Sequence, residues 1–129
     1  MHGKFRNGSW YKYFYIIFTG EKKTKTKLYL LPDQTELYIS TVTLYELLMG
    51  ATDDVKKEDI KILTQPLTIL PLTKPVAEKS ARIYHALRKR SKLIEFRDIF
   101  IGATALVHGL PLLTHNAKHF DRIDGLSVI

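Results

Sequence analysis

The sequence predicts an α/β domain in which a central, mainly parallel sheet lies between two layers of helices. Short apolar runs typical of strands alternate with longer helical segments along the chain. Such alternation is typical of parallel sheets, because parallel strands are joined by helices that cover both faces. The segment 98–108 contains one carboxylate and is otherwise almost entirely apolar, which predicts a helix that is buried on most of its faces.

Length and composition favour one domain over residues 1–129. The chain has 129 residues, of which 45% are hydrophobic, and this is enough for a core of its own. It contains no cysteine, so disulfides and thiolate chemistry are excluded. No apolar run approaches the ~20 residues that a membrane-spanning helix needs. We therefore expect a cytoplasmic protein that does not associate with membranes.

The first half of the chain is expected to begin with a loose segment over 1–12, which shows no regular period. The apolar run 13–18 is too short to distinguish a strand from a buried helix. A short basic helix is expected over 22–31, ended by Pro32. A strand over 36–40 and a helix over 41–49 follow, and Gly50 closes that helix.

The second half is expected to contain a helix over 54–63 that ends near Pro66, and a strand over 67–72 that is bounded by prolines. A long helix runs over 75–92, with an inward face that carries Ala77, Ala81, Tyr84 and Leu87. The buried helix 98–108 is capped by Gly109. A strand over 111–114, a helical turn over 117–120 and a last short strand over 126–129 complete the chain.

The basic charge of the chain is concentrated in two places. Residues 1–31 carry seven basic residues against Glu21 alone, a net +6 of the total +7. Such a block favours a polyanionic partner through counterion release, although a merely solvated surface is equally consistent with it. The cluster at Arg88 and Arg90 ends the helix 75–92, where the helix dipole favours cations in any case.

Two carboxylates are the leading candidates for chemistry. Glu46 lies beside the apolar stripe of the helix 41–49, and the alternative is a capping box formed by Thr43 and Glu46. Asp98 opens the buried helix, and the alternative is a helix cap or a first-turn carboxylate. Polar residues Thr114 and Asn116 follow the next strand. A site is favoured because the carboxyl ends of parallel strands meet at one edge of the sheet.

The ligand types indicate a hard divalent cation. Glu46 and Asp98 offer carboxylate oxygens, and Asn116 can add an amide oxygen directly or through water. Oxygen ligands suit Mg²⁺ or Mn²⁺ rather than zinc. The five histidines show no tight zinc spacing. A cation held by carboxylates can activate water and stabilise charge on a phosphodiester.

Three stretches together resemble a known family. The segments 38–51, 97–105 and 112–126 resemble the second, third and fourth motifs of PIN-domain ribonucleases, most closely those of VapC toxins from toxin–antitoxin pairs. Their order and spacing also match, so the resemblance covers residues 21–129. It implies a three-layer PIN fold, a Mg²⁺- or Mn²⁺-dependent endoribonuclease that hydrolyses RNA, a homodimer and a cognate antitoxin partner.

The resemblance also implies roles for individual residues. Glu46 and Asp98 match the acidic metal ligands of the family, and Asn116 matches a position where the family carries Asp or Asn. Thr114 matches a polar residue beside that site, and His119 stands where many members carry another Asp. The substrate-binding residues are expected to be Thr114 together with the basic side chains that would hold the RNA backbone: Arg88, Arg90 and the N-terminal cations.

The start of the chain departs from the family pattern. PIN domains begin with a strand followed by an Asp-Thr-Asn-like motif whose Asp is a central metal ligand. Residues 12–20 occupy that stretch here, and the first acidic residue, Glu21, comes after it. Losing a carboxylate should weaken Mg²⁺ binding, because ligand charge offsets the cost of dehydrating the ion. The alternative function is therefore a catalytically inactive module that binds RNA or an antitoxin.

Three explanations for the atypical segment 1–20 stay open. The chain is a degenerate member, the start of its gene is disturbed by a frameshift, or another residue replaces the missing carboxylate. The sequence offers no candidate for such a replacement. The aromatic and basic residues over 10–14 favour core packing over stacking on single-stranded nucleic acid.

Overall fold

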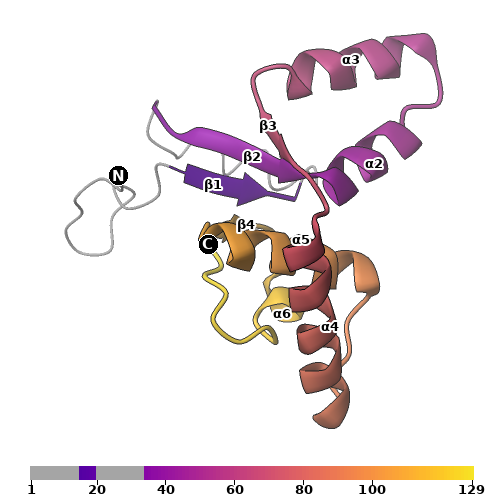
Figure 1. Cartoon of the computed structure of the whole chain (residues 1–129). Helices are drawn as coiled ribbons and strands as arrows, with labels where there is room; N and C mark the ends of the chain where they lie inside the picture. Colours follow the sequence, from indigo (N-terminus) through magenta and orange to yellow (C-terminus); the bar gives the residue numbers. More distant parts are fainter. Residues whose placement is uncertain (1–14, 20–33) are drawn as a thin grey trace.

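The computed structural model describes residues 15–19 and 34–129, which form a parallel sheet with helices packed against it (Figure 1). The four strands lie in the order β3–β2–β1–β4, and every neighbouring pair is parallel. Their bounds are β1 Tyr15–Phe18, β2 Glu36–Ser40, β3 Thr68–Leu70 and β4 Leu112–Leu113. Because all four strands run the same way, their carboxyl ends share one edge of the sheet.

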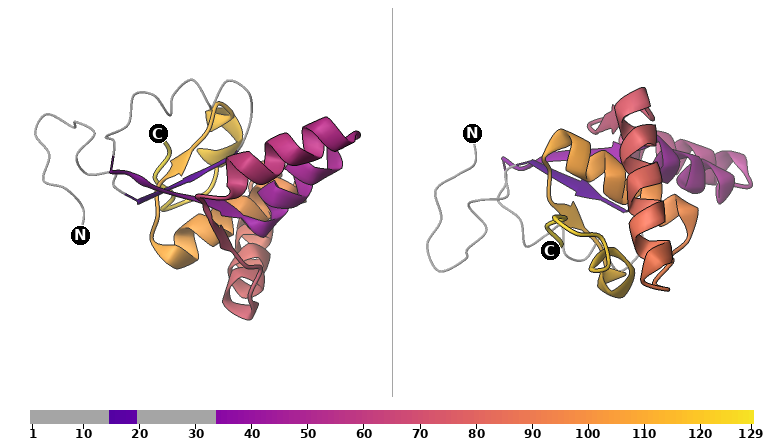
Figure 2. Two further views of the ribbon diagram at one scale, coloured as in Figure 1. Left: turned by 90° about the horizontal axis from the view of Figure 1, so that it is seen from above. Right: turned by 60° about the horizontal axis from the view of Figure 1, so that its bottom comes forward.

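The helices cover the sheet unequally. They are α2 Thr41–Met49, α3 Asp54–Thr64, α4 Lys74–Lys89, α5 Phe96–His108 and α6 Ala117–Phe120. Helices α4 and α5 pack against one face, where Ile17 of β1 and Leu112 of β4 join the main core. Ile39 and Leu113 face the other side, together with apolar side chains of α2. Figure 2 shows α2 and α3 extending away from the sheet as an arm.

The fold class is confirmed, and most of the expected elements are present. The run that allowed either a strand or a helix contains the central strand β1. The bounds of β2 and α2 agree with the expectation. Helix α5 is buried along Ile101–Ala105, as its apolar composition predicts. It begins at Phe96, two residues before the expected start, so Asp98 lies within its first turn.

The predicted inward face of α4 is confirmed at Leu87, but its other three residues are wrong by one position. Its buried residues are Val76, Ser80, Ile83 and Leu87, while the expected Ala77, Ala81 and Tyr84 are exposed. The larger Val76 and Ile83 remove more apolar surface from water than two alanines do. Ser80 tolerates burial because its hydroxyl donates to the Val76 carbonyl at 2.7 Å, which leaves no unsatisfied donor.

The expected last strand is reduced to a single bridge. Val128 forms an isolated parallel bridge with Leu112. The Leu112 N–H donates to the Ser127 carbonyl at 2.8 Å, and the Ile129 N–H donates to the Leu112 carbonyl at 2.9 Å. These bonds hold the C-terminal segment against β4, the strand that leads into Thr114 and Asn116.

Other predictions fall outside the described residues. These are the loose start over 1–12, the short basic helix over 22–31 and all the basic residues of the N-terminal block. The one-domain organisation stays a prediction. Within residues 15–19 and 34–129, no helix is long and apolar enough to cross a membrane.

Candidate functional site

A pocket of about 400 Å³ opens at the carboxyl edge of the sheet and contains the predicted site residues Glu46, Asp98 and Asn116. Side chains from helices α2, α5 and α6 and from the end of β1 meet there. We call it the acidic pocket, and its lining residues are Thr19, Glu46, Glu95, Arg97, Asp98, Ile101, Asn116, His119 and Phe120.

Glu46 is held in the pocket by the way α2 begins. Ser40 caps this helix, and its hydroxyl accepts from the Thr43 N–H at 3.0 Å. The alternative capping box is therefore wrong, because Thr43 lies inside the helix and is itself buried. Glu46 lies one helical turn later, and its side chain keeps 30% of its surface exposed at the pocket.

Asp98 lies in the first turn of α5 and faces across to α6. Its Oδ2 is 3.0 Å from Nδ1 of His119, and its side chain is only 18% exposed. Burial raises the pKa of Asp98 above its usual value, while the hydrogen bond from His119 opposes this shift. A first-turn carboxylate also gains from the helix dipole, so the structural role and a role in the pocket coexist.

The ring of His119 joins two of the predicted site residues. Its Nδ1 lies 3.0 Å from Asp98 Oδ2 and 2.8 Å from Asn116 Nδ2. A single ring nitrogen either donates its proton to the carboxylate or accepts from the amide, since it has one proton or one lone pair. The protonation state of this nitrogen therefore decides whether His119 supports Asp98 or Asn116.

Thr114 lies behind the pocket rather than in its lining. It is 1% exposed, and its Oγ1 accepts from the Asn116 N–H at 2.9 Å. Thr19, at the end of β1, donates its hydroxyl hydrogen to the same Oγ1 at 3.2 Å. Thr114 therefore holds the ends of β1 and β4 in position, and its predicted contact with substrate stays a prediction.

Arg97 places a fixed positive charge among the carboxylates. Its Nη1 lies 3.0 Å from Oε2 of Glu46, and its other terminal nitrogen donates to Glu95. The Arg97 guanidinium lowers the pKa of Glu95, and Glu95 in turn raises the pKa of Arg97. The two carboxylates of the predicted site thus each have a nitrogen partner: Arg97 for Glu46 and His119 for Asp98.

The types of donor atom in the pocket fit a hard divalent cation, which we expect to bind with modest affinity. Glu46 and Asp98 supply carboxylate oxygens, and Asn116 and Thr19 can supply neutral oxygens. Mg²⁺ in proteins often uses only one or two carboxylates and keeps several waters. Among the described residues, no group of three or more histidine, cysteine, aspartate or glutamate side chains is arranged to hold a metal ion.

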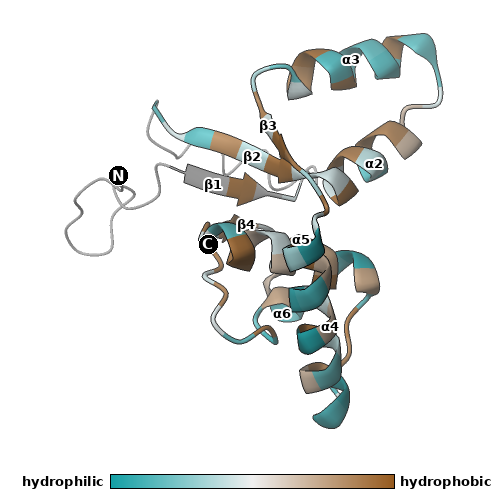
Figure 3. Ribbon diagram, in the orientation of Figure 1, coloured by the Kyte–Doolittle hydropathy of each residue, from teal (hydrophilic) through white to brown (hydrophobic). Residues whose placement is uncertain are grey.

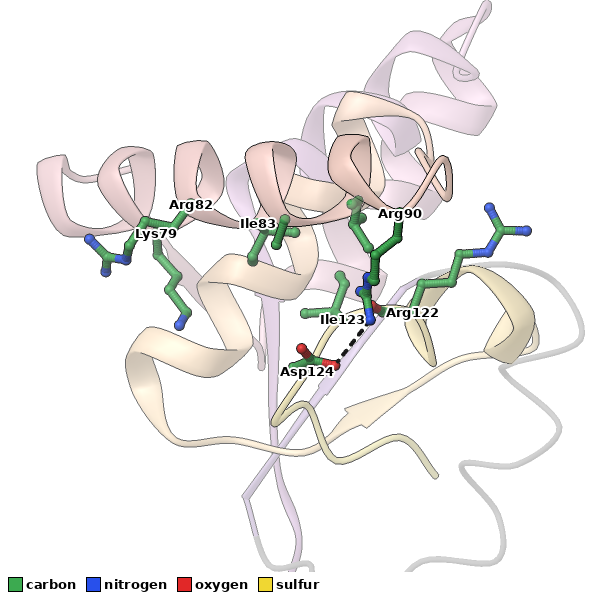
Figure 4. A pocket seen from close by; sticks show the side chains of 9 residues that line it. Lys79, Arg82, Ile83, Arg90, Arg122, Ile123 and Asp124 are labelled. Atoms are coloured by element: carbon green, nitrogen blue, oxygen red, sulfur yellow. Dashed lines mark hydrogen bonds and ion pairs between the residues drawn. The ribbon is translucent and has the colours of Figure 1, made fainter.

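The predicted substrate-binding arginines Arg88 and Arg90 lie outside the acidic pocket. Arg88 donates to the Tyr84 hydroxyl at 3.2 Å. Arg90 donates to the Arg122 carbonyl at 2.8 Å and lies 3.6 Å from Asp124. Figure 4 shows Arg90 turned toward Asp124. Arg90 belongs to a second cavity, of about 210 Å³, that we call the basic seam; its charged residues are Lys79, Arg82, Arg90, Arg122 and Asp124.

Three polar residues of the pocket, Thr19, Glu95 and Arg97, were assigned no role from the sequence. Thr19 could have been found because it directly follows an apolar run, at the position where a parallel strand reaches the carboxyl edge. Arg97 precedes Asp98, so both lie in the first turn of one helix. Its partner Glu46 is about fifty residues earlier in the chain, and no local signal predicts that contact.

The sheet order and the acidic pocket define an α/β domain with an oxygen-rich site at the carboxyl edge of its parallel strands. A family model described as PIN domain matches residues 13–126. The chain therefore belongs to the PIN domain family, which confirms the resemblance based on the three motifs.

Relatives and solved structures agree with this assignment. Ribonuclease VapC1 of Rickettsia felis is 39% identical over 102 residues, which cover 73% of this chain and 75% of the relative. Ribonuclease VapC1 of Methanocaldococcus jannaschii is 31% identical over 85 residues, covering 66% of this chain and 62% of the relative. A toxin–antitoxin complex from Klebsiella pneumoniae contains a chain with a TM-score of 0.66 and 29% identity, and the match covers 88% of this chain and 94% of that one.

Proposed function

We propose that this protein is a divalent-metal-dependent endoribonuclease of the VapC type, which hydrolyses phosphodiester bonds in RNA with reduced efficiency. The observation that carries the proposal is the convergence of Glu46, Asp98 and Asn116 in one pocket, although they belong to three segments far apart in the sequence. The names of the relatives, which are ribonucleases, support the same reaction.

Each residue has a distinct part in the proposed reaction. Glu46 and Asp98 would hold Mg²⁺ or Mn²⁺, and Asn116 would assist through its amide oxygen. The bound metal supplies activation of water and stabilisation of charge on the phosphate. His119, by donating to Asp98, holds that carboxylate in its orientation. Arg88 is exposed at the end of α4, where it could contact the RNA backbone, as could the basic residues of segment 1–31.

The reduced efficiency follows from the number of carboxylates. Thr19 lies at the end of β1 and lines the pocket, in the part of the fold where the resemblance implies an Asp. A hydroxyl is a neutral ligand, so it does less than a carboxylate to offset the cost of dehydrating the ion. We expect the site to need a higher metal concentration than a site with three carboxylates.

The proposal is tested by cleavage of a mixed RNA pool by the purified chain in Mn²⁺. Asp98→Asn and Asp98→Ala, prepared identically, control for contaminating nucleases. We expect slow, Mn²⁺-dependent cleavage that both variants lose. Equal cleavage by the wild type and both variants would contradict the proposed site, and no cleavage by any of the three would contradict the activity.

A second candidate is a PIN-like binding module without activity. It is favoured by the pairing of both predicted ligands with nitrogen partners, since Glu46 contacts Arg97 and Asp98 contacts His119. Titration of Mn²⁺ into the protein discriminates between the two. Saturable binding that Glu46→Gln abolishes would argue against the inactive module, whereas RNA binding that is indifferent to Mn²⁺ and to Glu46 would favour it.

We also propose a cognate antitoxin as a partner, because a structural relative was solved as a toxin–antitoxin complex. The arm formed by α2 and α3 presents exposed apolar side chains, and Figure 3 shows hydrophobic colour toward the end of α2. They are Tyr45, Leu48, Met49, Val55 and Ile62. Co-expression with the product of a small neighbouring gene tests this partner. Light scattering of the isolated chain, in a buffer that mimics the cytoplasm, tests the expected homodimer.

A further inference from the structure

Arg97 is a permanent cation inside a pocket of carboxylates. Among the described residues that line the acidic pocket, it is the sole lysine or arginine. Its Nη1 lies 3.0 Å from Oε2 of Glu46, and the pair is partly buried, with side chains 39% and 30% exposed. A guanidinium in this position uses a carboxylate oxygen that a metal ion would need.

Arg97 and Asp98 cannot be separated in space, because they are adjacent in the first turn of α5. A cation held by Asp98 and Glu46 would therefore lie close to the guanidinium. Like charges at short range repel, and the repulsion is screened less in a partly buried pocket than at an open surface.

We propose that Arg97 competes with a divalent cation for Glu46, so that the pocket neutralises itself in the metal-free protein and accepts metal only when the guanidinium moves away. This inference rests on the proposed metal site and adds a residue that lowers the affinity of that site for the metal ion. In the metal-free protein, the ion pair compensates the charge of Glu46 within the pocket.

Glu95 provides the position to which the guanidinium can move. It precedes α5 and already contacts the second terminal nitrogen of Arg97. Its side chain is 61% exposed, so it lies toward the mouth of the pocket rather than its interior. When Arg97 leaves Glu46, it keeps this partner and its charge stays compensated.

The arrangement predicts opposite effects for loss of Arg97 and for loss of its second partner, Glu95. Arg97→Gln removes the competing charge and should tighten Mn²⁺ binding by about three- to tenfold, the range expected from losing one partly exposed ion pair and one like-charge repulsion. Glu95→Gln removes the alternative partner, so Arg97 stays on Glu46 and Mn²⁺ binding should weaken by about twofold or more.

The experiment is a titration of Mn²⁺ into the full chain, followed by calorimetry and by electron paramagnetic resonance of the free ion. Arg82→Gln is the matched control, because it removes the same charge from the exposed face of α4, away from the acidic pocket. It should leave the affinity within about twofold of the wild type. Thermal unfolding of each variant checks that the fold is retained.

The outcomes separate clearly. Tighter binding by Arg97→Gln and weaker binding by Glu95→Gln, with Arg82→Gln unchanged, would support competition. Unchanged or weaker binding by Arg97→Gln would overturn it, and so would equal tightening by Arg82→Gln or a complete lack of Mn²⁺ binding in every variant. If Arg97→Gln tightens binding but RNA is not cleaved, the inference stands and the proposed enzymatic function fails.

Discussion

The acidic pocket and the basic seam are both cavities rimmed by charged side chains, yet they differ in what those charges contact. In the basic seam, the guanidinium of Arg90 donates to a backbone carbonyl and lies near Asp124, whose side chain is 86% exposed. The Arg122 guanidinium donates to the carbonyls of Lys92 and Leu93. These contacts join the C-terminal segment to the end of α4 and leave the charges in solvent.

In the acidic pocket, the charged side chains contact one another across separate helices, and one of them is largely buried. Glu46 of α2 meets Arg97 of α5, and Asp98 of α5 meets His119 of α6. Burial raises the pKa of Asp98, so the fold holds this carboxylate in an environment that disfavours its charged form. A carboxylate in a pocket whose pKa is raised by burial is typical of a functional site.

The largest expected effect is on RNA cleavage, which should depend on the acidic pocket and not on surface charge elsewhere. Glu46→Gln should lower RNA cleavage by at least about 100-fold, because charge stabilisation by a held metal is worth several kcal/mol and each ~1.4 kcal/mol is tenfold in rate. Glu78→Gln is the matched control, since Glu78 lies exposed on α4 outside both cavities. Rates measured on the same RNA pool check this, and comparable losses in the two variants would refute the distinction.

The start of α2 should matter more for stability than its exposed surface does. Ser40→Ala removes the side chain that accepts from the Thr43 N–H, so we expect the free energy of unfolding to fall by about 1–2 kcal/mol. Urea denaturation measures this change. A loss below about 0.3 kcal/mol would show that the cap contributes little and that packing alone positions Glu46.

The basic seam should act through stability rather than through catalysis. Arg90→Gln removes a hydrogen bond to the Arg122 carbonyl and an ion pair with Asp124, and it should cost about 1 kcal/mol of unfolding free energy. Asp124→Asn removes only the exposed ion pair and should cost less than about 0.5 kcal/mol. Equal losses, measured by urea denaturation, would mean that the carbonyl contact contributes nothing.

The smallest expected effect is a gain in the stability of the fold rather than a loss. Because the pKa of Asp98 is raised in the folded protein, its ionisation lowers the stability of the fold as pH rises through that raised pKa. In the metal-free protein at about pH 7, Asp98→Asn should therefore be slightly more stable than the wild type. The difference should vanish below the ordinary value of 3.8, where the carboxyl is protonated in both states. Thermal unfolding in EDTA across this range checks it; a gap that widens at low pH would reverse the argument.

The fold was largely predictable because its strongest signals are local. The unbroken apolar run of α5 predicts that this helix is buried. The boundaries of β2 and α2 are marked by Ser40 and Gly50. The inward face of α4 was not predictable in the same way. Its alanines and its branched residues form two adjacent apolar stripes, and only packing against α5 selects the one that carries Val76 and Ile83.

The candidate site was predictable in its carboxylates but not in their partners. Glu46 and Asp98 stood out because each is a charge beside an apolar stretch. Which group neutralises each of them depends on the crossing of α2, α5 and α6, and sequence spacing carries no information about that crossing. The pairing of Arg97 with Glu46 is therefore visible only in three dimensions.

Both edges of the sheet are protected against pairing with strands of other molecules. At one edge, β3 has three residues and lies between Pro66 and Pro71, which lack the N–H needed to extend a ladder. At the other edge, residues 127–129 hydrogen-bond along β4 and cover it. Open edges promote aggregation. Removing residues 127–129 should therefore expose β4 as an edge strand that can pair with other molecules, and should lower the solubility of the protein.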